Sequence, residues 1–162
     1  FKFLIIGICL SFCLAITLSP YQFSGEYPRL PDSPSQKITP IKWQALNAAK
    51  IKQLVKLNKI IFVDITADWC ITCKVNKTFV LNKEPILSKL NGQEIVTMQA
   101  DWTLPDEEIA NYLFTFHRYG IPFNIVYGPG APEGILLPEL LREKTILAAI
   151  DTAKRLIRER NR

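Results

Sequence analysis

Two cysteines, Cys70 and Cys73, stand two residues apart in the sequence Cys-Ile-Thr-Cys. They follow a β-branched run at residues 59–66 and precede a helical pattern, and such a pair at a strand–helix junction is typical of dithiol–disulfide redox chemistry. A helix N-terminus presents unpaired N–H groups and the positive end of the helix dipole, which favour thiolate over thiol. We therefore predict that Cys70, nearest the terminus, attacks the substrate. Cys73, one turn further on, then resolves the mixed disulfide.

A structural or zinc-binding role for the pair is the alternative. A four-coordinate zinc site needs two further ligands. The other cysteines, Cys9 and Cys13, lie in an apolar run, and His117 is the only histidine. We therefore expect no metal and no cofactor other than a redox-active Cys70–Cys73 disulfide. His117 lies near a predicted helix end, where a surface or capping role is the simplest expectation.

Hydrophobic periodicity indicates which elements hold the pair in place. Thr39 and Pro40 suit the start of a first helix, and Thr103 suits the cap of a later one. The order of helices and strands predicts an α/β sandwich with a mixed central sheet. The predicted elements are helix 40–55, strand 59–66, helix 71–90, strand 94–100, helix 105–117, strand 122–127, strand 134–137 and helix 143–160.

The N-terminal segment is a separate question, because residues 3–18 are almost continuously apolar and residues 3–25 carry no charge. This run falls short of the roughly 20 residues of a full membrane span. A signal peptide is one interpretation. The other, which we favour, is a transmembrane helix whose start is missing, since the chain opens with Phe rather than Met. The predicted organisation is a transmembrane helix or uncleaved signal at 1–19, a proline-rich linker at 20–39 and a globular domain at 40–162.

Cys9 and Cys13 lie four residues apart within the apolar run, on one face of the predicted helix. A second redox pair is conceivable there, but adjacent turns of one helix hold two cysteines poorly for a disulfide. We interpret them as small apolar residues of a membrane helix. The net charge of +5 arises from scattered Lys and Arg. A nucleic-acid binder would show a basic stripe with a known motif, so we expect no nucleic-acid partner.

The block Ala-Asp-Trp-Cys-Ile-Thr-Cys-Lys at residues 67–74 resembles the active-site segment of the thioredoxin superfamily. The resemblance is strongest to the C-terminal thioredoxin-like domain of the thiol:disulfide interchange protein DsbD family, and it covers about residues 40–155. It implies a thioredoxin-like three-layer sandwich. The segment Ala-Asp-Trp-Thr at 100–103 is similar to the stretch after the second strand in related bacterial membrane reductases.

The resemblance also assigns roles to residues outside the cysteine pair. Asp64, six residues before Cys70, occupies the position of a buried acid whose raised pKa suits proton exchange with Cys73; a strand-end aspartate that meets water is the plainer alternative. Pro122 occupies the place of the family's cis-proline. A cis bond there would set the backbone of Ile121 beside Cys70, ready to pair with an incoming peptide, whereas a trans-proline would merely start a strand. Trp69, Ile121 and Pro122 are therefore the predicted substrate-binding residues.

Two features depart from the family pattern. The cysteines enclose Ile71 and Thr72 rather than the Gly-Pro of ordinary thioredoxins. Some members carry an acid on the helix after the second cysteine, where this chain has Asn76 and Lys77. A positive charge there favours thiolate and argues against a second proton-handling acid.

The function implied by the resemblance is a membrane-tethered protein-disulfide reductase. A membrane domain would supply electrons, and the thioredoxin-like domain would pass them to an extracytoplasmic acceptor, either a disulfide isomerase or a cytochrome c maturation factor. The implied location is the bacterial inner membrane, with this domain facing the periplasm. A thiol oxidase or isomerase of the same fold is the main alternative, and a CxxC metal-binding module is another.

Overall fold

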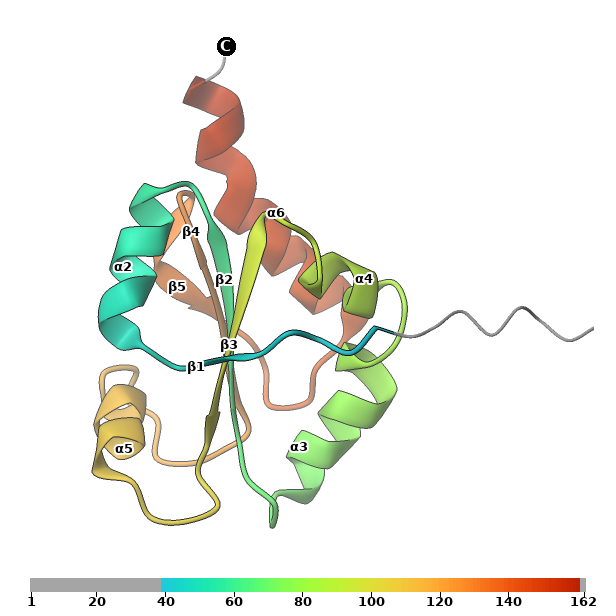
Figure 1. Ribbon diagram of the computed structural model, residues 1–162, viewed down its shortest axis with the longest axis vertical. Coiled ribbons are helices and arrows are strands. Elements are labelled where there is room, and N and C mark those ends of the chain that lie inside the picture. Colours follow the sequence, from blue (N-terminus) through green and yellow to red (C-terminus); the bar gives the residue numbers. More distant parts are fainter. Residues whose placement is uncertain (1–38, 161–162) are drawn as a thin grey trace, which may run out of the picture. The chain divides into compact units, whose positions relative to one another are not determined.

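A five-stranded mixed sheet organises the protein, whose computed structural model describes residues 39–160 (Figure 1). The strand order is β1-β3-β2-β4-β5, which confirms the predicted α/β sandwich. The elements are β1 (Gln44–Ala45), α2 (Ala48–Lys56), β2 (Ile60–Thr66), α3 (Ile71–Asn76), a π-helical turn η1 (Lys77–Leu81), α4 (Ile86–Leu90), β3 (Ile95–Asp101), α5 (Glu107–Phe114), β4 (Phe123–Gly128), β5 (Ala131–Leu136) and α6 (Glu143–Arg160).

The central strand β2 pairs with β3 in parallel, from Ile60 opposite Ile95 to Thr66 opposite Asp101. On its other side β2 pairs antiparallel with β4, which forms a hairpin with β5. A strand with neighbours on both sides and helices on both faces has every backbone group paired and nearly every side chain buried, which explains its continuous apolar run. All seven residues of β2 are buried.

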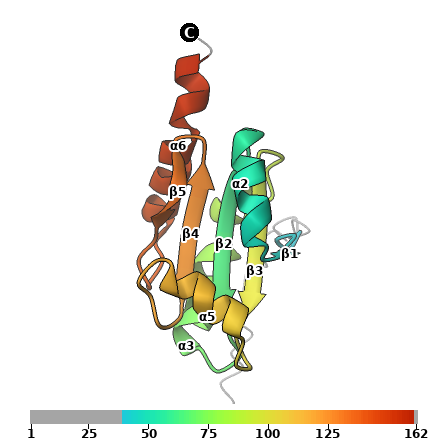
Figure 2. The same cartoon turned by 90° about the vertical axis from the view of Figure 1, so that its left-hand side faces the viewer.

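Two helix layers cover the sheet (Figures 1 and 2): α2 and α5 lie on one face, and α3, α4 and α6 lie on the other. Side chains alternate along β2, so Ile61, Val63 and Ile65 join the core beneath α2 and α5. Ile60 and Phe62 join the opposite core, with residues of η1, α4 and α6. By the same alternation Asp64 projects from the face that carries α3.

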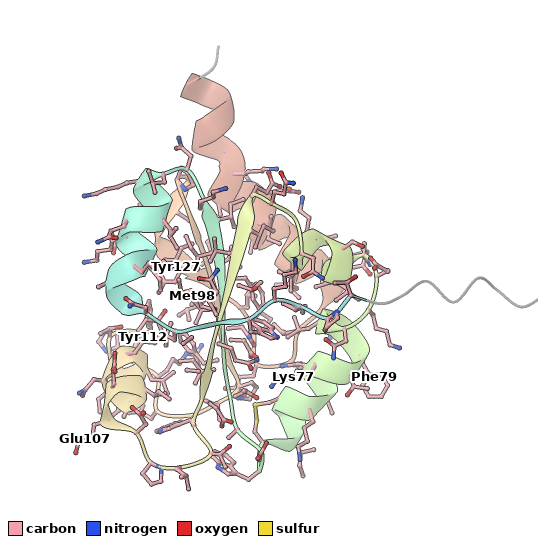
Figure 3. The ribbon with its side chains drawn as sticks, viewed as in Figure 1. Lys77, Phe79, Met98, Glu107, Tyr112 and Tyr127 are labelled. Carbon is pink, nitrogen blue, oxygen red and sulfur yellow. A yellow bond between two sulfur atoms is a disulfide. The ribbon has the colours of Figure 1, made fainter. Side chains whose placement is uncertain are left out.

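The core beneath α2 and α5 contains aromatic and polarisable side chains (Figure 3). Tyr112 of α5 and Tyr127 of β4 share a hydrogen bond of 2.7 Å between their hydroxyls. Met98 of β3 is fully buried in the same cluster. These contacts fix α5 against the sheet, and with it the loops on either side of that helix.

The prediction that Thr39 caps a helix beginning at Pro40 is wrong. The first helix begins at Ala48, and the side chain of Asn47 caps it by accepting a hydrogen bond of 2.9 Å from the backbone N–H of Lys50. The residues before it form the short edge strand β1 instead. Pairing with β3 gives these backbone groups partners that an isolated sequence pattern does not reveal.

The single helix predicted at 71–90 is also wrong. Its path is divided into α3, η1 and α4, with a turn before Ile86. Pro85 lacks a backbone N–H and its ring crowds the preceding turn, so a continuous helix cannot pass through it. Asp106, rather than Thr103, caps α5 by accepting a 3.0 Å hydrogen bond from the N–H of Ile109.

His117 ends the α5 segment in a left-handed conformation, with φ of 54°. Its N–H donates to Phe114 O, and the N–H of Arg118 donates to Leu113 O, which is the pattern of a Schellman cap. The side chain of His117 is exposed. The expectation of a surface and capping residue is confirmed, although the cap is made by its backbone.

The predicted transmembrane helix at 1–19 and nearly all of the predicted linker at 20–39 lie outside the described residues. Between residues 39 and 160, no helix combines the length and the apolar character that crossing a membrane requires.

Candidate functional site

A disulfide joins Cys70 and Cys73 at the start of α3, just after β2 ends, with their Cα atoms 5.3 Å apart. Cys70 is the N-cap of α3, and its Sγ accepts a hydrogen bond of 3.2 Å from the backbone N–H of Cys73. This places the sulfur of Cys70 against the positive end of the helix, as predicted. Cys70 is 5% exposed and Cys73 2%, so both are buried in the disulfide state and Cys70 is only slightly the more accessible.

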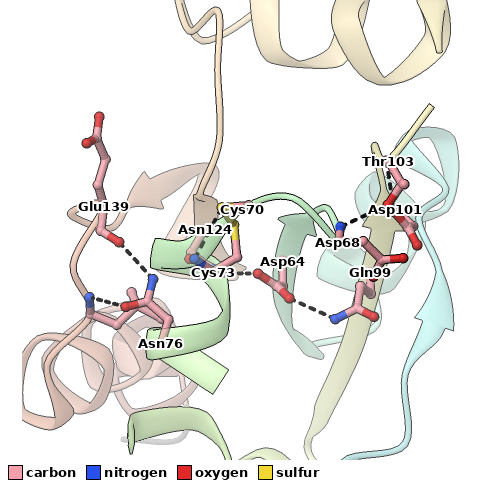
Figure 4. The surroundings of a disulfide bond; sticks show 11 residues. Asp64, Asp68, Cys70, Cys73, Asn76, Gln99, Asp101, Thr103, Asn124 and Glu139 are labelled. Atoms are coloured by element: carbon pink, nitrogen blue, oxygen red, sulfur yellow. Dashed lines mark hydrogen bonds between the residues drawn. A yellow bond between two sulfur atoms is a disulfide. The ribbon is translucent and has the colours of Figure 1, made fainter. Parts of the chain in front are cut away.

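A row of three polar side chains crosses the sheet in the surroundings of this disulfide (Figure 4). Asp64 of β2 lies directly opposite Gln99 of β3 and Asn124 of β4 in the strand registers. Gln99 Nε2 donates to one carboxylate oxygen of Asp64 at 2.7 Å, and Asn124 Nδ2 donates to the other at 2.8 Å. Because register fixes all three on one face, the carboxyl group has a partner on each side.

Burial raises the pKa of Asp64 above its ordinary value, because the ionised form is poorly solvated there. The positive charge of Lys77 and the hydrogen bonds from Gln99 and Asn124 work in the opposite direction and offset this only in part. The predicted buried acid with a raised pKa is therefore present. Its role in proton transfer remains a prediction.

The segment that follows β3 makes hydrogen bonds to the two residues that precede Cys70. The side chain of Asp101 accepts a 2.9 Å hydrogen bond from the N–H of Thr103. The hydroxyl of Thr103 accepts a 2.9 Å hydrogen bond from the backbone N–H of Asp68, and the carbonyl of Thr103 accepts one of 3.3 Å from Trp69 Nε1. Trp69 thus stands beside the disulfide with a fixed indole and 60% of its surface exposed.

The loop before β4 supplies the other wall of the site. The Ile121–Pro122 peptide bond is cis, as the sequence predicts. Ile121 is half-buried and packs against Cys70 and Cys73. The structure thus brings Ile121 and Pro122 to the disulfide; that they bind substrate remains a prediction.

A groove of about 630 Å³ opens next to Trp69 and Gly120. Aromatic side chains and the acids Asp106 and Glu107 are among the residues that line it. One of these aromatic residues is Tyr119, which is 76% exposed. An exposed aromatic groove beside a redox disulfide offers a surface for a protein partner.

Sequence reasoning predicted no contact for three residues that the structure brings to the site: Gln99 and Asn124, described above, and Asn76, which it noted only as a departure from the family pattern. The side chain of Asn76 is buried; its Nδ2 donates to Glu139 O at 2.7 Å, and its Oδ1 accepts from the N–H of Leu141 at 3.0 Å. It ties α3 to the loop before α6. A polar residue inside an otherwise apolar strand or helix face is the one signal that could have pointed to these three.

The family model described as thioredoxin-like matches residues 42–129. The chain belongs to the thioredoxin-like family. Its fold is shared with the C-terminal domain of Neisseria meningitidis DsbD in the oxidised form, at 19% identity over 69% of this chain and 99% of that domain, with a TM-score of 0.54. The reduced form of that domain matches at 21% identity over 65% of this chain and 91% of that one, with a TM-score of 0.51.

An oxidoreductase named DsbH is also similar in fold, at 16% identity over 73% of this chain and 87% of that one, with a TM-score of 0.53. No curated protein sequence matches the chain. Membership of the thioredoxin-like family, together with the Cys70–Cys73 disulfide at the start of α3, makes the chain a thiol–disulfide oxidoreductase. Within residues 39–160, no three His, Cys, Asp or Glu side chains gather closely enough to hold a metal ion.

Proposed function

We propose that the protein is a membrane-tethered protein-disulfide reductase. It would receive electrons from a membrane donor domain and pass them through Cys70 and Cys73 to extracytoplasmic protein acceptors. Those acceptors would be a disulfide isomerase or a cytochrome c maturation factor. The proposed location is the bacterial inner membrane, with this domain in the periplasm.

The surroundings of the Cys70 sulfur support the proposal that the protein donates electrons. A strongly oxidising site owes its high potential to a stabilised reduced form, above all a stabilised thiolate. Here the sulfur accepts one hydrogen bond, from a backbone N–H, and the spacer residues Ile71 and Thr72 bring no positive charge. Without a cation in the spacer the thiolate is stabilised less than in a site that has one, which supports a low potential and hence donation of electrons.

The surface around the disulfide is suited to binding a protein acceptor. Exposed Trp69 precedes Cys70 and lines the groove together with Tyr119, and Ile121 of the cis Ile121–Pro122 bond packs against the cysteines. An extended segment of the acceptor can place its own disulfide over Cys70 while its backbone pairs beside Ile121. Trp69 then covers apolar surface of the acceptor at little entropic cost, since an indole has few rotatable bonds.

The reduction potential tests the direction of electron flow. The full chain is equilibrated with glutathione mixtures, and the fraction of reduced protein is measured. We expect a potential near the roughly −270 mV of thioredoxin, and a value above about −150 mV would establish an oxidase instead. Ile71→His should raise the potential by adding a cation beside the thiolate, whereas the neutral control Ile71→Gln should not.

Trapping identifies the acceptor. Cys73→Ala leaves Cys70 able to attack but unable to be released, so a mixed disulfide with the partner should accumulate in cells. Cys70→Ala is the matched control, because it removes the attacking sulfur and should trap nothing. If Cys73→Ala forms no adduct, or both variants form the same adduct, the exchange scheme is wrong.

Membrane tethering has its own test. After cell lysis the full-length protein should sediment with the membranes and stay there in high salt, which removes peripheral proteins. In intact spheroplasts, a thiol reagent that cannot cross the membrane should label reduced Cys70. Recovery in the soluble fraction, or labelling only after lysis, would refute the proposed location while leaving the chemistry intact.

A further inference from the structure

Asn124 is almost entirely buried, at 2% exposure, and uses only half of its carboxamide. Its Nδ2 donates to Asp64, while its Oδ1 has no hydrogen-bond partner. A buried carbonyl without a partner costs free energy, so native proteins seldom keep one without a reason. Asn124, with its unpartnered Oδ1, lies in the surroundings of the disulfide (Figure 4).

The arrangement around Asp64 suits a carboxylate anion. Both oxygens accept hydrogen bonds from amide N–H groups, one from Gln99 and one from Asn124. A protonated carboxyl must instead donate its O–H to an acceptor. With both neighbours donating, the neutral acid would have nowhere to direct its proton.

We propose that Asn124 is a positioning residue that serves Asp64 in both protonation states by rotating its carboxamide through half a turn. In one orientation Nδ2 donates to the carboxylate. In the other, Oδ1 accepts the proton of the carboxylic acid. The torsion that carries an asparagine amide is roughly two-fold, so the rotation needs no change in the backbone. It exchanges one unpartnered atom for another, so neither orientation is strongly excluded.

This inference rests on the proposed function and on the predicted role of Asp64 as the proton acceptor in it, because that role makes the rotation part of the exchange reaction. In the mixed disulfide, the thiol of Cys73 transfers its proton to the Asp64 carboxylate, and the resulting thiolate attacks Cys70 Sγ. The Cys70–Cys73 bond forms and the bond from Cys70 to the substrate sulfur breaks. The substrate sulfur leaves as a thiolate carrying the electron pair and takes a proton from water. Oδ1 of Asn124 then accepts a hydrogen bond from the protonated carboxyl group of Asp64.

The charges around Asp64 influence the pH at which its carboxyl group titrates. From η1, Lys77 favours the anion. From β3, Asp101 stands at the exposed strand end and is itself hydrogen-bonded to Thr103. From α3, Cys73 adds a titrating thiol once the disulfide is reduced. The first measurement is therefore made on the oxidised protein, in which Cys73 does not titrate.

The decisive experiment follows hydrogen-bond couplings by NMR in the isotopically labelled full chain, oxidised and without substrate. Above the titration midpoint of Asp64, through-bond coupling should connect Nδ2 of Asn124 and Nε2 of Gln99 to the carboxyl carbon. Below the midpoint, the coupling from Asn124 should disappear while that from Gln99 persists. Persistence of the Asn124 coupling on both sides of the midpoint would overturn the rotation.

Variants supply the second readout. Asn124→Leu removes a donor to the anion and should raise the Asp64 midpoint by about one pH unit or more. Asn124→Ser keeps a group that both donates and accepts, and should restore part of the shift. Asn91→Leu is the matched control, because Asn91 also carries a buried, unpartnered Oδ1 but donates to Thr39 O, away from Asp64.

The outcomes are separable from those for the proposed function. An unchanged midpoint in Asn124→Leu, or an equal shift in Asn91→Leu, would refute the role of Asn124 whatever the activity. If Asn124→Leu does not fold, the couplings in the unmodified protein still decide the question. A high reduction potential would refute the reductase and leave the titration and couplings as they are.

Discussion

Replacing Asp64 by Asn should stabilise the oxidised protein at neutral pH while slowing its chemistry. Burial raises the pKa of Asp64, so between the unfolded and native pKa values the native state holds a proton that the unfolded state has lost. The stability that this proton contributes is fully present below the unfolded pKa, about 3.9. It is lost as pH rises through the native pKa. The amide of the variant does not titrate, so the variant does not suffer this loss.

The size of the effect follows from a single proton. The free energy of unfolding of the natural protein should fall relative to the variant by at most about 1.4 kcal/mol per pH unit in that window, and then level off. Against this gain, an amide at position 64 brings an N–H group toward the donors of Gln99 and Asn124. One of them must rotate or lose its partner, which costs about 1 kcal/mol. The variant should therefore equal or trail the natural protein in acid and exceed it at neutral pH.

The assay is denaturant unfolding of both oxidised proteins from acid to mildly alkaline pH. Glu94 has a lowered pKa because of Lys154, and Asp101 because of Thr103, so their contributions are lost as pH falls. Both are common to the two proteins and cancel in the difference. Asp68→Asn, which removes the same charge from an exposed side chain beside the motif, is the matched control. A difference between Asp64→Asn and the natural protein that does not vary with pH would refute the reasoning.

Three further predictions concern other parts of the site and sheet. Lys77→Met removes a charge that lowers the pKa of Asp64, so the pH profile of mixed-disulfide resolution should move to higher pH; the exposed control Lys74→Met should leave it in place. Asn76→Leu leaves the buried N–H of Leu141 and the partly buried carbonyl of Glu139 without their partner and should cost about 2–4 kcal/mol of unfolding free energy, measured in urea. A cost below about 1 kcal/mol would mean that the loop before α6 finds other partners. Gly134→Ala should lower the thermal midpoint by several degrees, because its φ is +88° and an added Cβ would stand 2.5 Å from an isoleucine carbon of β4; an unchanged midpoint would contradict that crowding.

Local signals predicted most of the architecture. The β-branched runs marked β2 and β3, and the helical spacing of apolar residues marked α6, because buried faces repeat with the period of the element. Element ends were predicted less well. Thr39 and Thr103 both look like helix caps, yet Asn47 and Asp106 make the hydrogen bonds, since a cap is chosen by where tertiary contacts begin the helix.

The type of chemistry could be predicted from the local sequence around Cys70 and Cys73. Two cysteines at a strand–helix junction indicate a redox site, because the helix terminus stabilises the thiolate of a sulfur that lies there. The surroundings of that site depend on contacts between distant parts of the chain. Gln99 and Asn124 reach Asp64 because three strands from distant parts of the chain align in one register. Neither partner lies near Asp64 in sequence, so no local pattern could have shown that its carboxyl group is held between two amides.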